Sequence, residues 1–382
     1  MLESVLGNYD EAYRFGQLAL KLQEIQGHAR RIPHTYPLVY TFFHHWRHPL
    51  RECLEPLNYA YEVGMTTGEV DGGFIAIQAH LSLAFHCGLP LRDVEAAFRL
   101  YCNQMADFDH YSETTLVQPL WQCCLNLLDQ SDDPLVLTGE AMNEERHHFE
   151  AAKSGHHMAI FSSGLARIIL CCFLDNSTGL EELVSGLRES TRIRSHFNLY
   201  ISLFYTALST IAMARTSNER WALRKARKCY SLLVKYVEKA GCSNCIPLAS
   251  FVKAELADLT WRRQKQNTIL ELYDQAIADA TDQGLVHVQA MATEKAGEHL
   301  LRKSKQANTS SASPSISSPS GATYLQNAWR LFYDWGAIAK ANQMRQKHPE
   351  LLARVKDRDL DLPSAVTTIT PQSDEPLTEP DE

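Results

Sequence analysis

Apolar residues recur at three- and four-residue spacing along almost all of this chain of 382 residues. That spacing places them on one face of an α-helix, whereas the sustained two-residue alternation that would indicate strands is nearly absent. Breaks rich in Gly, Pro, Ser and Asp divide the chain into roughly ten to twelve helices joined by short turns. The sequence therefore predicts an all-α protein built from stacked helix pairs.

The charge pattern excludes several classes of partner. The formal net charge is −8, and acidic and basic residues are mixed along most of the chain. Nucleic acid and anionic lipid bind basic surfaces, which this pattern does not provide. The most apolar stretches, 74–91 and 158–174, contain polar side chains, and the N-terminus does not resemble a secretory signal. We therefore expect a cytoplasmic protein that binds neither nucleic acid nor membrane.

The ten cysteines lie mostly inside helical patterns, as in Cys123-Cys124 and Cys171-Cys172. A disulfide framework would instead place cysteines at spaced positions in loops. We therefore interpret them as reduced, small apolar side chains that pack in the core.

Two segments share a pattern of small and aromatic residues. Residues 7–20 read GNYDEAYRFGQLAL, and residues 271–284 read ELYDQAIADATDQG. Helices that pair closely need Gly or Ala where they cross, and an aromatic side chain fills the adjacent groove. The pattern is similar to the second helix of a tetratricopeptide repeat, although no regular period runs through the middle of the chain. The residues that carry it are Gly7, Tyr9, Ala12, Ala19, Tyr273, Ala276 and Ala280.

Longer stretches carry a second resemblance, at residues 42–73 and at residues 272–303 followed by 324–352. They resemble the helical region of very large signalling proteins, in which a serine/threonine kinase and a STAND-type AAA ATPase precede that region. A GAF domain and a histidine kinase follow it there. The last stretch contains the aromatic-x-Trp-Gly-Ala-x-Ala-Lys block of that family, made here by Tyr333, Trp335, Gly336, Ala337, Ala339 and Lys340. The resemblance implies an α-solenoid of divergent tetratricopeptide-like helical hairpins.

Composition divides the chain into four parts. Residues 1–303 are predicted to form the tetratricopeptide-like helical repeat domain. Residues 304–321 are rich in Ser and Pro and too poor in apolar side chains to offset the entropy of ordering, so we expect a disordered insertion. Residues 322–356 are predicted to add the terminal helical hairpin of the same solenoid, and residues 357–382 to form a disordered acidic tail.

The sequence lacks the motifs of nucleotide binding and phosphoryl transfer. A nucleotide-binding P-loop needs a Gly-rich turn followed by Lys and Ser or Thr, and no such motif occurs. The catalytic motifs of protein kinases are also missing. We therefore expect a protein that is not an enzyme, and no catalytic residue is transferred from the resembled family.

Two weak candidates for metal binding stand out, and neither is complete. Glu145 and His148 are spaced i and i+3 on a predicted helix, as in di-iron bundles, but the second Glu-x-x-His of such bundles is missing. Cys242 and Cys245 form a Cys-x-x-Cys pair in a predicted turn, without a second pair at ligand spacing. We interpret both as structural and predict no metal and no cofactor.

Histidines are also dense just before Pro49. His44, His45 and His48 flank Trp46. We interpret these residues as an aromatic cluster that packs where two repeats meet, and a ligand role is the alternative.

The resemblance implies a function without chemistry. In the resembled proteins this region lies between an ATPase and a sensory kinase, so we expect a non-catalytic scaffold or coupler in signal transduction, with such proteins among its partners. One alternative is a fragment of a multidomain sensor histidine kinase, and another is a helical sensor with a pocket for a small effector. Because the chain starts within a repeat, we also expect the apolar face with Tyr9, Phe15 and Leu18 to be uncovered and to promote self-association.

Overall fold

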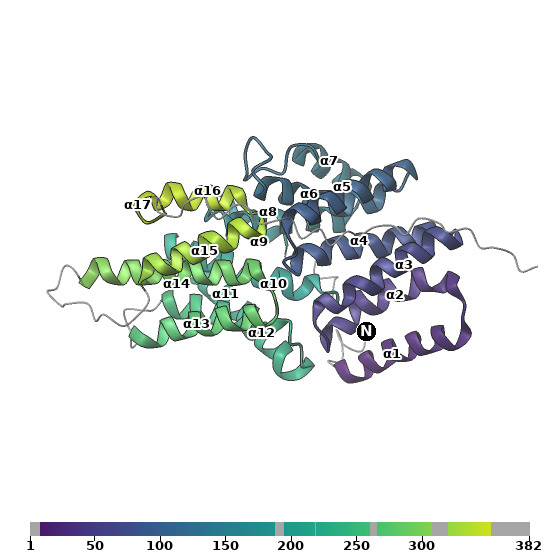
Figure 1. Cartoon of the computed structure of the whole chain (residues 1–382), viewed down its shortest axis with the longest axis horizontal. Helices are drawn as coiled ribbons and strands as arrows, with labels where there is room; N and C mark the ends of the chain where they lie inside the picture. The colour runs from purple at the N-terminus through teal and green to yellow at the C-terminus, as the bar shows by residue number, and fades with distance from the viewer. Residues whose placement is uncertain (1–7, 188–194, 218, 260–265, 308–319, 353–382) are drawn as a thin grey trace, which may run out of the picture.

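The computed structural model of the chain describes residues 8–187, 195–217, 219–259, 266–307 and 320–352. In these ranges all regular structure is helical, which confirms the all-α prediction (Figure 1). The described ranges contain seventeen α-helices, more than the sequence pattern indicated, because some turns carry no Gly or Pro. Between two of the helices, for example, Asp109 takes the left-handed conformation with a φ of 61°.

The helices are α1 (Tyr9–Gln26), α2 (Ile32–Phe42), α3 (Leu54–Thr67), α4 (Val70–His86), α5 (Leu91–Asp107), α6 (Tyr111–Leu127), α7 (Glu144–Ser154), α8 (His157–Phe173), α9 (Leu180–Gly186), α10 (Asn198–Ser217), α11 (Arg220–Ala240), α12 (Cys245–Leu259), α13 (Gln266–Asp282), α14 (Val286–Ala307), α15 (Gly321–Trp335), α16 (Ile338–Lys347) and α17 (Pro349–Leu352). The 3-10 turns are η2 (Ala29–Arg31), η3 (His44–Trp46) and η4 (Leu50–Cys53). None of the described helices combines the length and the apolar character that crossing a membrane needs.

Two predicted segments fall largely outside the described residues. Within the expected insertion at 304–321, helix α14 continues to Ala307 and helix α15 begins at Gly321, while residues 308–319 are outside the description. The expected acidic tail at 357–382 lies outside it entirely, as do residues 353–356 of the expected terminal hairpin.

Seven of the even-numbered helices, from α2 to α14, form a continuous row. Helices α2, α4, α6, α8, α10, α12 and α14 each contact the next member of this row as well as odd-numbered helices next to them in sequence. The row members α4, α6 and α8 bury residues on most of their faces. Helices α5 and α11 instead bury one stripe and expose the opposite face, as expected for an outer layer. The chain therefore builds an inner row and an outer layer of helices.

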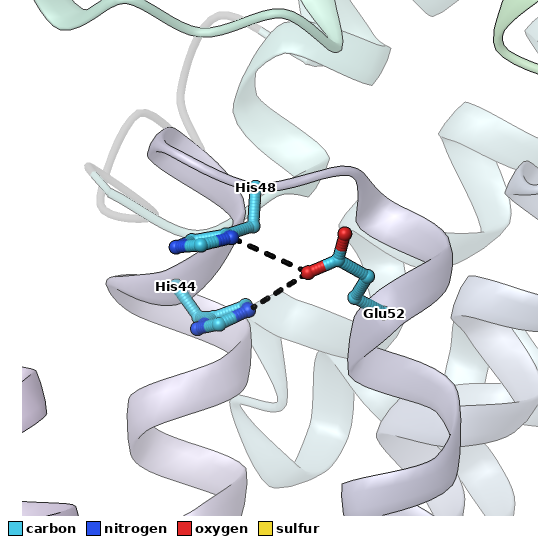
Figure 2. A group of neighbouring side chains, drawn as sticks. All are labelled: His44, His48 and Glu52. Carbon is cyan, nitrogen blue, oxygen red and sulfur yellow. Dashed lines mark ion pairs between the residues drawn. The ribbon is translucent and has the colours of Figure 1, made fainter.

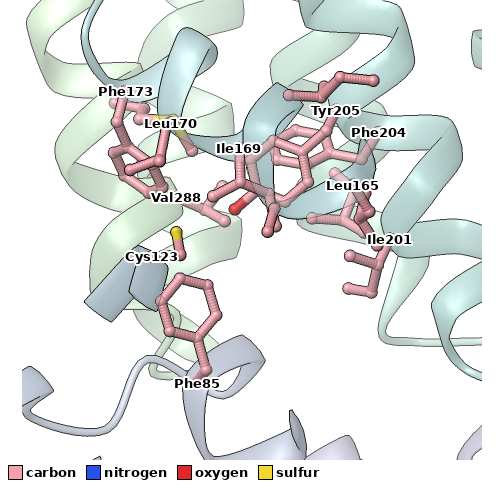
Figure 3. Close-up of a cluster of buried hydrophobic side chains, with 14 of the residues drawn as sticks. Phe85, Cys123, Leu165, Ile169, Leu170, Phe173, Ile201, Phe204, Tyr205 and Val288 are labelled. Carbon is pink, nitrogen blue, oxygen red and sulfur yellow. The ribbon is translucent and has the colours of Figure 1, made fainter. Parts of the chain in front are cut away.

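Side chains of the inner row meet in one hydrophobic core. Figure 3 shows Phe85 of α4, Cys123 of α6, Phe173 of α8, Tyr205 of α10 and Val288 of α14 gathered at its centre. All five are almost completely buried. Helices far apart in sequence are thus joined by the burial of apolar surface, which stabilises the fold by roughly 25 cal/mol for each Å² removed from water.

Glycine allows one helix pair to approach especially closely. A Cβ atom on Gly64 of α3 would lie 2.7 Å from the Cα of Gly73 in α4, closer than real Cβ contacts. Any larger side chain at this crossing would push the two helices apart. The close approach of α3 and α4 therefore depends on this glycine.

Most residues of the tetratricopeptide-like pattern lie in the core. The buried ones are Tyr9 and Ala12 of α1 and Tyr273, Ala276 and Ala280 of α13. Ala19 is half-buried, and Gly7 is outside the described residues. The glycine of α1 that meets a neighbouring helix is Gly16, where an added Cβ would lie 3.1 Å from the Cβ of Phe43.

The C-terminal helices return to the N-terminal half at Trp335. Its indole N–H donates to the carbonyl of Leu89, in the turn after α4, over 2.9 Å. Its ring packs against Phe85 of α4, Phe173 of α8 and His287 of α14. Trp335 is 2% exposed, so it fills the space between α4, α8 and α14 and fixes α15 against these helices of the inner row.

The residues beside Trp335 fix the direction of the chain as it leaves α15. Gly336 has a φ of 101°, a conformation that favours glycine, and an added Cβ would lie 3.2 Å from the Cβ of Leu91. Ala337 is fully buried, and Tyr333 stacks on Trp329 with ring centroids 5.1 Å apart. These packing roles account for the aromatic and small residues of this block.

Five of the described histidines are buried, and in three of them burial lowers the pKa most strongly. His45, His86 and His287 are between 0% and 3% exposed, and the Nδ1 atom of each has no hydrogen-bond partner among the described residues. Burial lowers the pKa of each imidazole to about 3, with neighbouring histidines adding to the effect for His45 and His86. All three rings are therefore neutral at physiological pH.

These histidines should make the fold sensitive to acid. Their ordinary pKa of about 6.5 applies in the unfolded chain, which therefore binds more protons than the folded chain between about pH 3 and 6.5. The free energy of unfolding is then greatest above pH 6.5 and falls as the pH drops. We expect each histidine to remove about 2 kcal/mol between pH 7 and pH 5, measured by urea unfolding.

A variant separates this effect from other titrations. His86→Leu should reduce the loss of stability between pH 7 and pH 5 by about 2 kcal/mol relative to the parent chain. An unchanged pH dependence in this variant would contradict the assignment.

Candidate functional site

A cavity of about 230 Å³ lies against the inner row, where its walls come from α8, α10, α12 and α14 and from the end of α16. Its charged lining is balanced. The acidic residues are Asp175, Glu255, Glu294 and Glu298, and the basic residues are Arg215, Lys295, Arg302 and Lys347. We call this cavity the charged cavity.

Asp175 is the centre of one group of charges. It lies in the turn after α8, at a φ of 49° that Asp tolerates better than most residues. Its carboxylate oxygens lie 2.6 Å from Lys295 Nζ, 3.2 Å from Lys340 Nζ and 3.1 Å from Lys347 Nζ. Burial raises the pKa of Asp175, but the three ammonium groups outweigh burial and hold this pKa well below its usual range. Asp175 therefore stays ionised.

Two glutamates of α14 complete this group. Lys340 Nζ lies 2.8 Å from Glu294 Oε1, as an ion pair rather than an aligned hydrogen bond, and both side chains are at most 2% exposed. Burial raises the pKa of Glu294. Burial also raises the pKa of Glu298, but Lys295, 3.0 Å away, and Lys347 outweigh it, and the pKa falls to about 2.

A second group of charges lies on the α10 and α12 side. Arg215 donates to Glu255 and to Asp258, each over 2.8 Å, and thereby joins α10 to α12. Asp258 also lies 2.7 Å from the Nδ1 of His299 in α14. Tyr273, one of the pattern residues in α13, donates its hydroxyl proton to Glu255 over 2.5 Å. Each buried carboxylate is thus paired, as the high free energy of an unpaired buried charge requires.

The two thiols that line the charged cavity are poor nucleophiles. Its thiols, Cys171 and Cys172, lie in α8, and burial raises the pKa of Cys172 to about 12. A thiol attacks as the thiolate, so Cys172 is unreactive near neutral pH. Asp175, Glu294 and Glu298 lie close enough to share a metal ion, but the lysines between them already neutralise their charge. The carboxylates that line the cavity are therefore paired with basic side chains of the protein itself.

The structure does not bring the predicted metal candidates into a ligand set. Glu145 is exposed on α7, and the Nε2 of His148 lies 2.9 Å from the hydroxyl of Ser163. The sulfur atoms of Cys242 and Cys245 are 3.6 Å apart, and both residues are fully buried. Among the described residues, neither pair belongs to a group of three neighbouring metal-ligating side chains.

Sequence reasoning did not find the charged cavity. Its ion pairs join residues as far apart as Asp175 and Lys347, which no local spacing relates. One signal was present, since Lys340 is the last residue of the aromatic-x-Trp-Gly-Ala-x-Ala-Lys block. A lysine that ends an otherwise apolar block needs a buried partner, and that partner could have been sought among the acidic residues.

Comparisons with protein-family models, with curated proteins and with solved structures found no match to this chain. The resemblance to the helical region of signalling proteins is therefore carried by the sequence stretches quoted above. A proposal for the charged cavity must therefore be argued from its own geometry and charge.

We expect Lys340 to be required for the stability of the fold only when the buried carboxylate of Glu294 is present. Lys340→Met leaves Glu294 buried without its partner, and we expect the free energy of unfolding to fall by about 3–5 kcal/mol in urea titrations. The double variant Lys340→Met/Glu294→Leu removes both charges and should recover most of that loss.

The exposed pair Arg146 and Glu150, 2.8 Å apart on α7, provides the control. Arg146→Met should leave the urea midpoint unchanged, because water screens exposed charges. The double variant could instead lose as much stability as Lys340→Met and Glu294→Leu lose together. In that case the two charges do not interact as described.

Proposed function

We propose that the chain is a non-catalytic binding and coupling module whose charged cavity holds a small zwitterionic effector. The observation that carries the proposal is the cavity of about 230 Å³ against the inner row, with equal numbers of acidic and basic side chains. A helical signalling region that binds a small effector needs such a pocket with converging polar groups.

The arrangement of the helices supports an α-solenoid of divergent tetratricopeptide-like hairpins. In such arrays each hairpin packs on the next, so that one helix of each pair forms a continuous inner layer. The contacts of α2 to α14 follow this rule. Tyr273 and Ala276, which carry the repeat pattern in α13, are fully buried.

The charge balance of the cavity selects the class of effector. A simple anion or cation would add net charge to a site that is already neutral, and the free energy of burying an unbalanced charge is high. A zwitterion adds none. Its ammonium group can pair with Glu298 and its carboxylate with Lys347, in place of the ion pair that these two residues make with each other, while Phe251 and Met291 supply apolar wall. The volume suits a molecule the size of an amino acid.

The position of the cavity supports a coupling role. Asp175 follows α8, whereas Lys295 belongs to α14 and Lys340 and Lys347 to α16, so the ion pairs hold the C-terminal helices against the middle of the chain. An effector whose carboxylate competes with Asp175 for Lys347 changes how α16 packs there. In the resembled signalling proteins this region lies between an ATPase and a sensor kinase, and such proteins are the partners we propose.

Calorimetric titration with the twenty standard amino acids, and with acetate and methylammonium as singly charged controls, tests this proposal. We expect saturable binding of at least one amino acid and none of the controls. Lys347→Gln should weaken that binding about tenfold, which corresponds to about 1.4 kcal/mol. Lys305→Gln, at an exposed position near the end of α14, is the matched control and should bind as the parent chain does.

Two results would count against the proposal. One is the absence of binding by every amino acid at concentrations up to about 10 mM, which corresponds to a negligible affinity. The other is an equal loss of affinity in Lys347→Gln and Lys305→Gln.

Self-association through α1 is a second candidate function, favoured by a different observation. Phe15, Leu18, Leu22 and Ile25 are 46–71% exposed, and their spacing places them along one face of the helix. A continuous exposed apolar stripe marks an interaction surface. Tyr9, which the sequence placed on the uncovered face, is instead buried against Trp46 and Tyr236.

Sedimentation equilibrium tests whether this stripe pairs with a second copy. We expect the parent chain to dimerise as its concentration rises and Leu18→Lys to remain a monomer, because a charge at the stripe opposes its burial. Leu100→Lys, at an exposed position on α5, is the control and should dimerise like the parent chain. A parent chain that stays monomeric excludes self-association.

A further inference from the structure

A group of three potential metal ligands lies far from the charged cavity, at the surface beside η3 and η4. Figure 2 shows the rings of His44 and His48 facing the carboxylate of Glu52. His44 Nε2 lies 3.8 Å and His48 Nδ1 lies 3.3 Å from the same oxygen of Glu52. All three ligand atoms lie within 4.8 Å of one another.

The chain reverses sharply between these residues, which is why they meet. On a continuous α-helix, residues eight positions apart are separated by about 12 Å along the axis, too far to share an ion. Here η3 ends at Trp46, and Pro49 is extended, with a φ of −52° and a ψ of 136°, before η4 begins. This break brings Glu52 back beside His44.

Asn244 holds this reversed segment from the opposite side. Its side-chain amide donates to the carbonyls of His45 and His48, over 2.7 Å and 2.9 Å, and its oxygen accepts from the backbone N–H of Leu50 over 2.8 Å. Asn244 is itself 6% exposed and lies in the Cys242–Cys245 turn. The backbone that carries the three ligands is therefore fixed in advance, as a metal site requires.

We propose that His44, His48 and Glu52 form a binding site for one divalent transition-metal ion, with Zn²⁺ as its preferred occupant. Two imidazoles and one carboxylate are a ligand set that zinc accepts with its fourth position left to water. Ligand atoms about 2.0–2.1 Å from a tetrahedral zinc are about 3.4 Å apart, close to the two distances measured to Glu52. Mg²⁺ and Ca²⁺ prefer oxygen ligands and fit this set poorly.

The surroundings of the histidines support this assignment. The hydroxyl of Tyr13 lies 2.8 Å from His48 Nε2, so that nitrogen has a partner while Nδ1 faces Glu52. Such a hydrogen bond from the second ring nitrogen orients metal-binding histidines. Among the described residues, Glu52 forms ion pairs with these two histidines. The carboxylates of the charged cavity differ, because lysines neutralise their charge.

Metal binding needs one local adjustment. The two imidazole rings are stacked 4.2 Å apart at an angle of 12°, so they must tilt for both nitrogens to point at one ion. The side chain of His48 is 37% exposed and that of Glu52 is 53% exposed, which leaves room for the tilt and for entry of the ion from solvent.

Calorimetric titration of the full chain with Zn²⁺, after treatment with a chelator, tests the site. We expect one ion to bind per chain, and Glu52→Gln and His48→Ala each to weaken the affinity at least tenfold. Glu55→Gln, which removes an exposed carboxylate one position into α3, is the matched control and should bind as the parent chain does. Loss of binding in Glu55→Gln but not in Glu52→Gln would overturn the proposal.

Cobalt substitution distinguishes this site from the other candidate ligands. Bound Co²⁺ should show the visible absorption of a tetrahedral site without the near-ultraviolet charge-transfer band of a cobalt–thiolate bond. A thiolate band that disappears in Cys242→Ser would assign the ion to the cysteine pair and overturn the proposal. Equal loss of cobalt binding in His148→Ala and His48→Ala would overturn it as well.

Discussion

The burial of Trp335 between α4, α8 and α14 is the contact on which the charged cavity depends. Its indole N–H is satisfied by Leu89, and its ring packs against aromatic residues of these three helices. Because Gly336 turns the chain directly afterwards, α16 starts from a fixed point and carries Lys340 to Asp175. A hydrophobic contact thus determines which charges meet.

The sequence predicted the helical class well, because helical periodicity is a local property. Tyr273, Ala276 and Ala280 were identified from spacing alone, and all three are buried. The turn at Asp109 was not identified, because no Gly or Pro marks it. The charged cavity could not be found in this way, because its residues meet only when helices distant in sequence pack together.

The histidine cluster shows a different limit of sequence analysis. The sequence indicated packing for His44 and His48, with a ligand role as the alternative, and no local spacing grouped Glu52 with them. On a continuous helix Glu52 would lie about 12 Å from His44, and only the reversal at Pro49 brings it close. The turn from Cys242 to Cys245 was a weak candidate for metal binding because of its two cysteines. In the structure its Asn244 instead donates hydrogen bonds to the backbone of the histidine segment.

The ion pair between Asp175 and Lys340 has a consequence for synthesis of the protein. The two residues are 165 positions apart. A ribosome adding about 5–20 residues per second needs roughly 8–33 seconds to pass from one to the other. Until then Asp175 can pair with Lys295, which is 120 positions further along the chain, but not with Lys340. The ion pairs that join α16 to the middle of the chain therefore form only after α16 has left the exit tunnel.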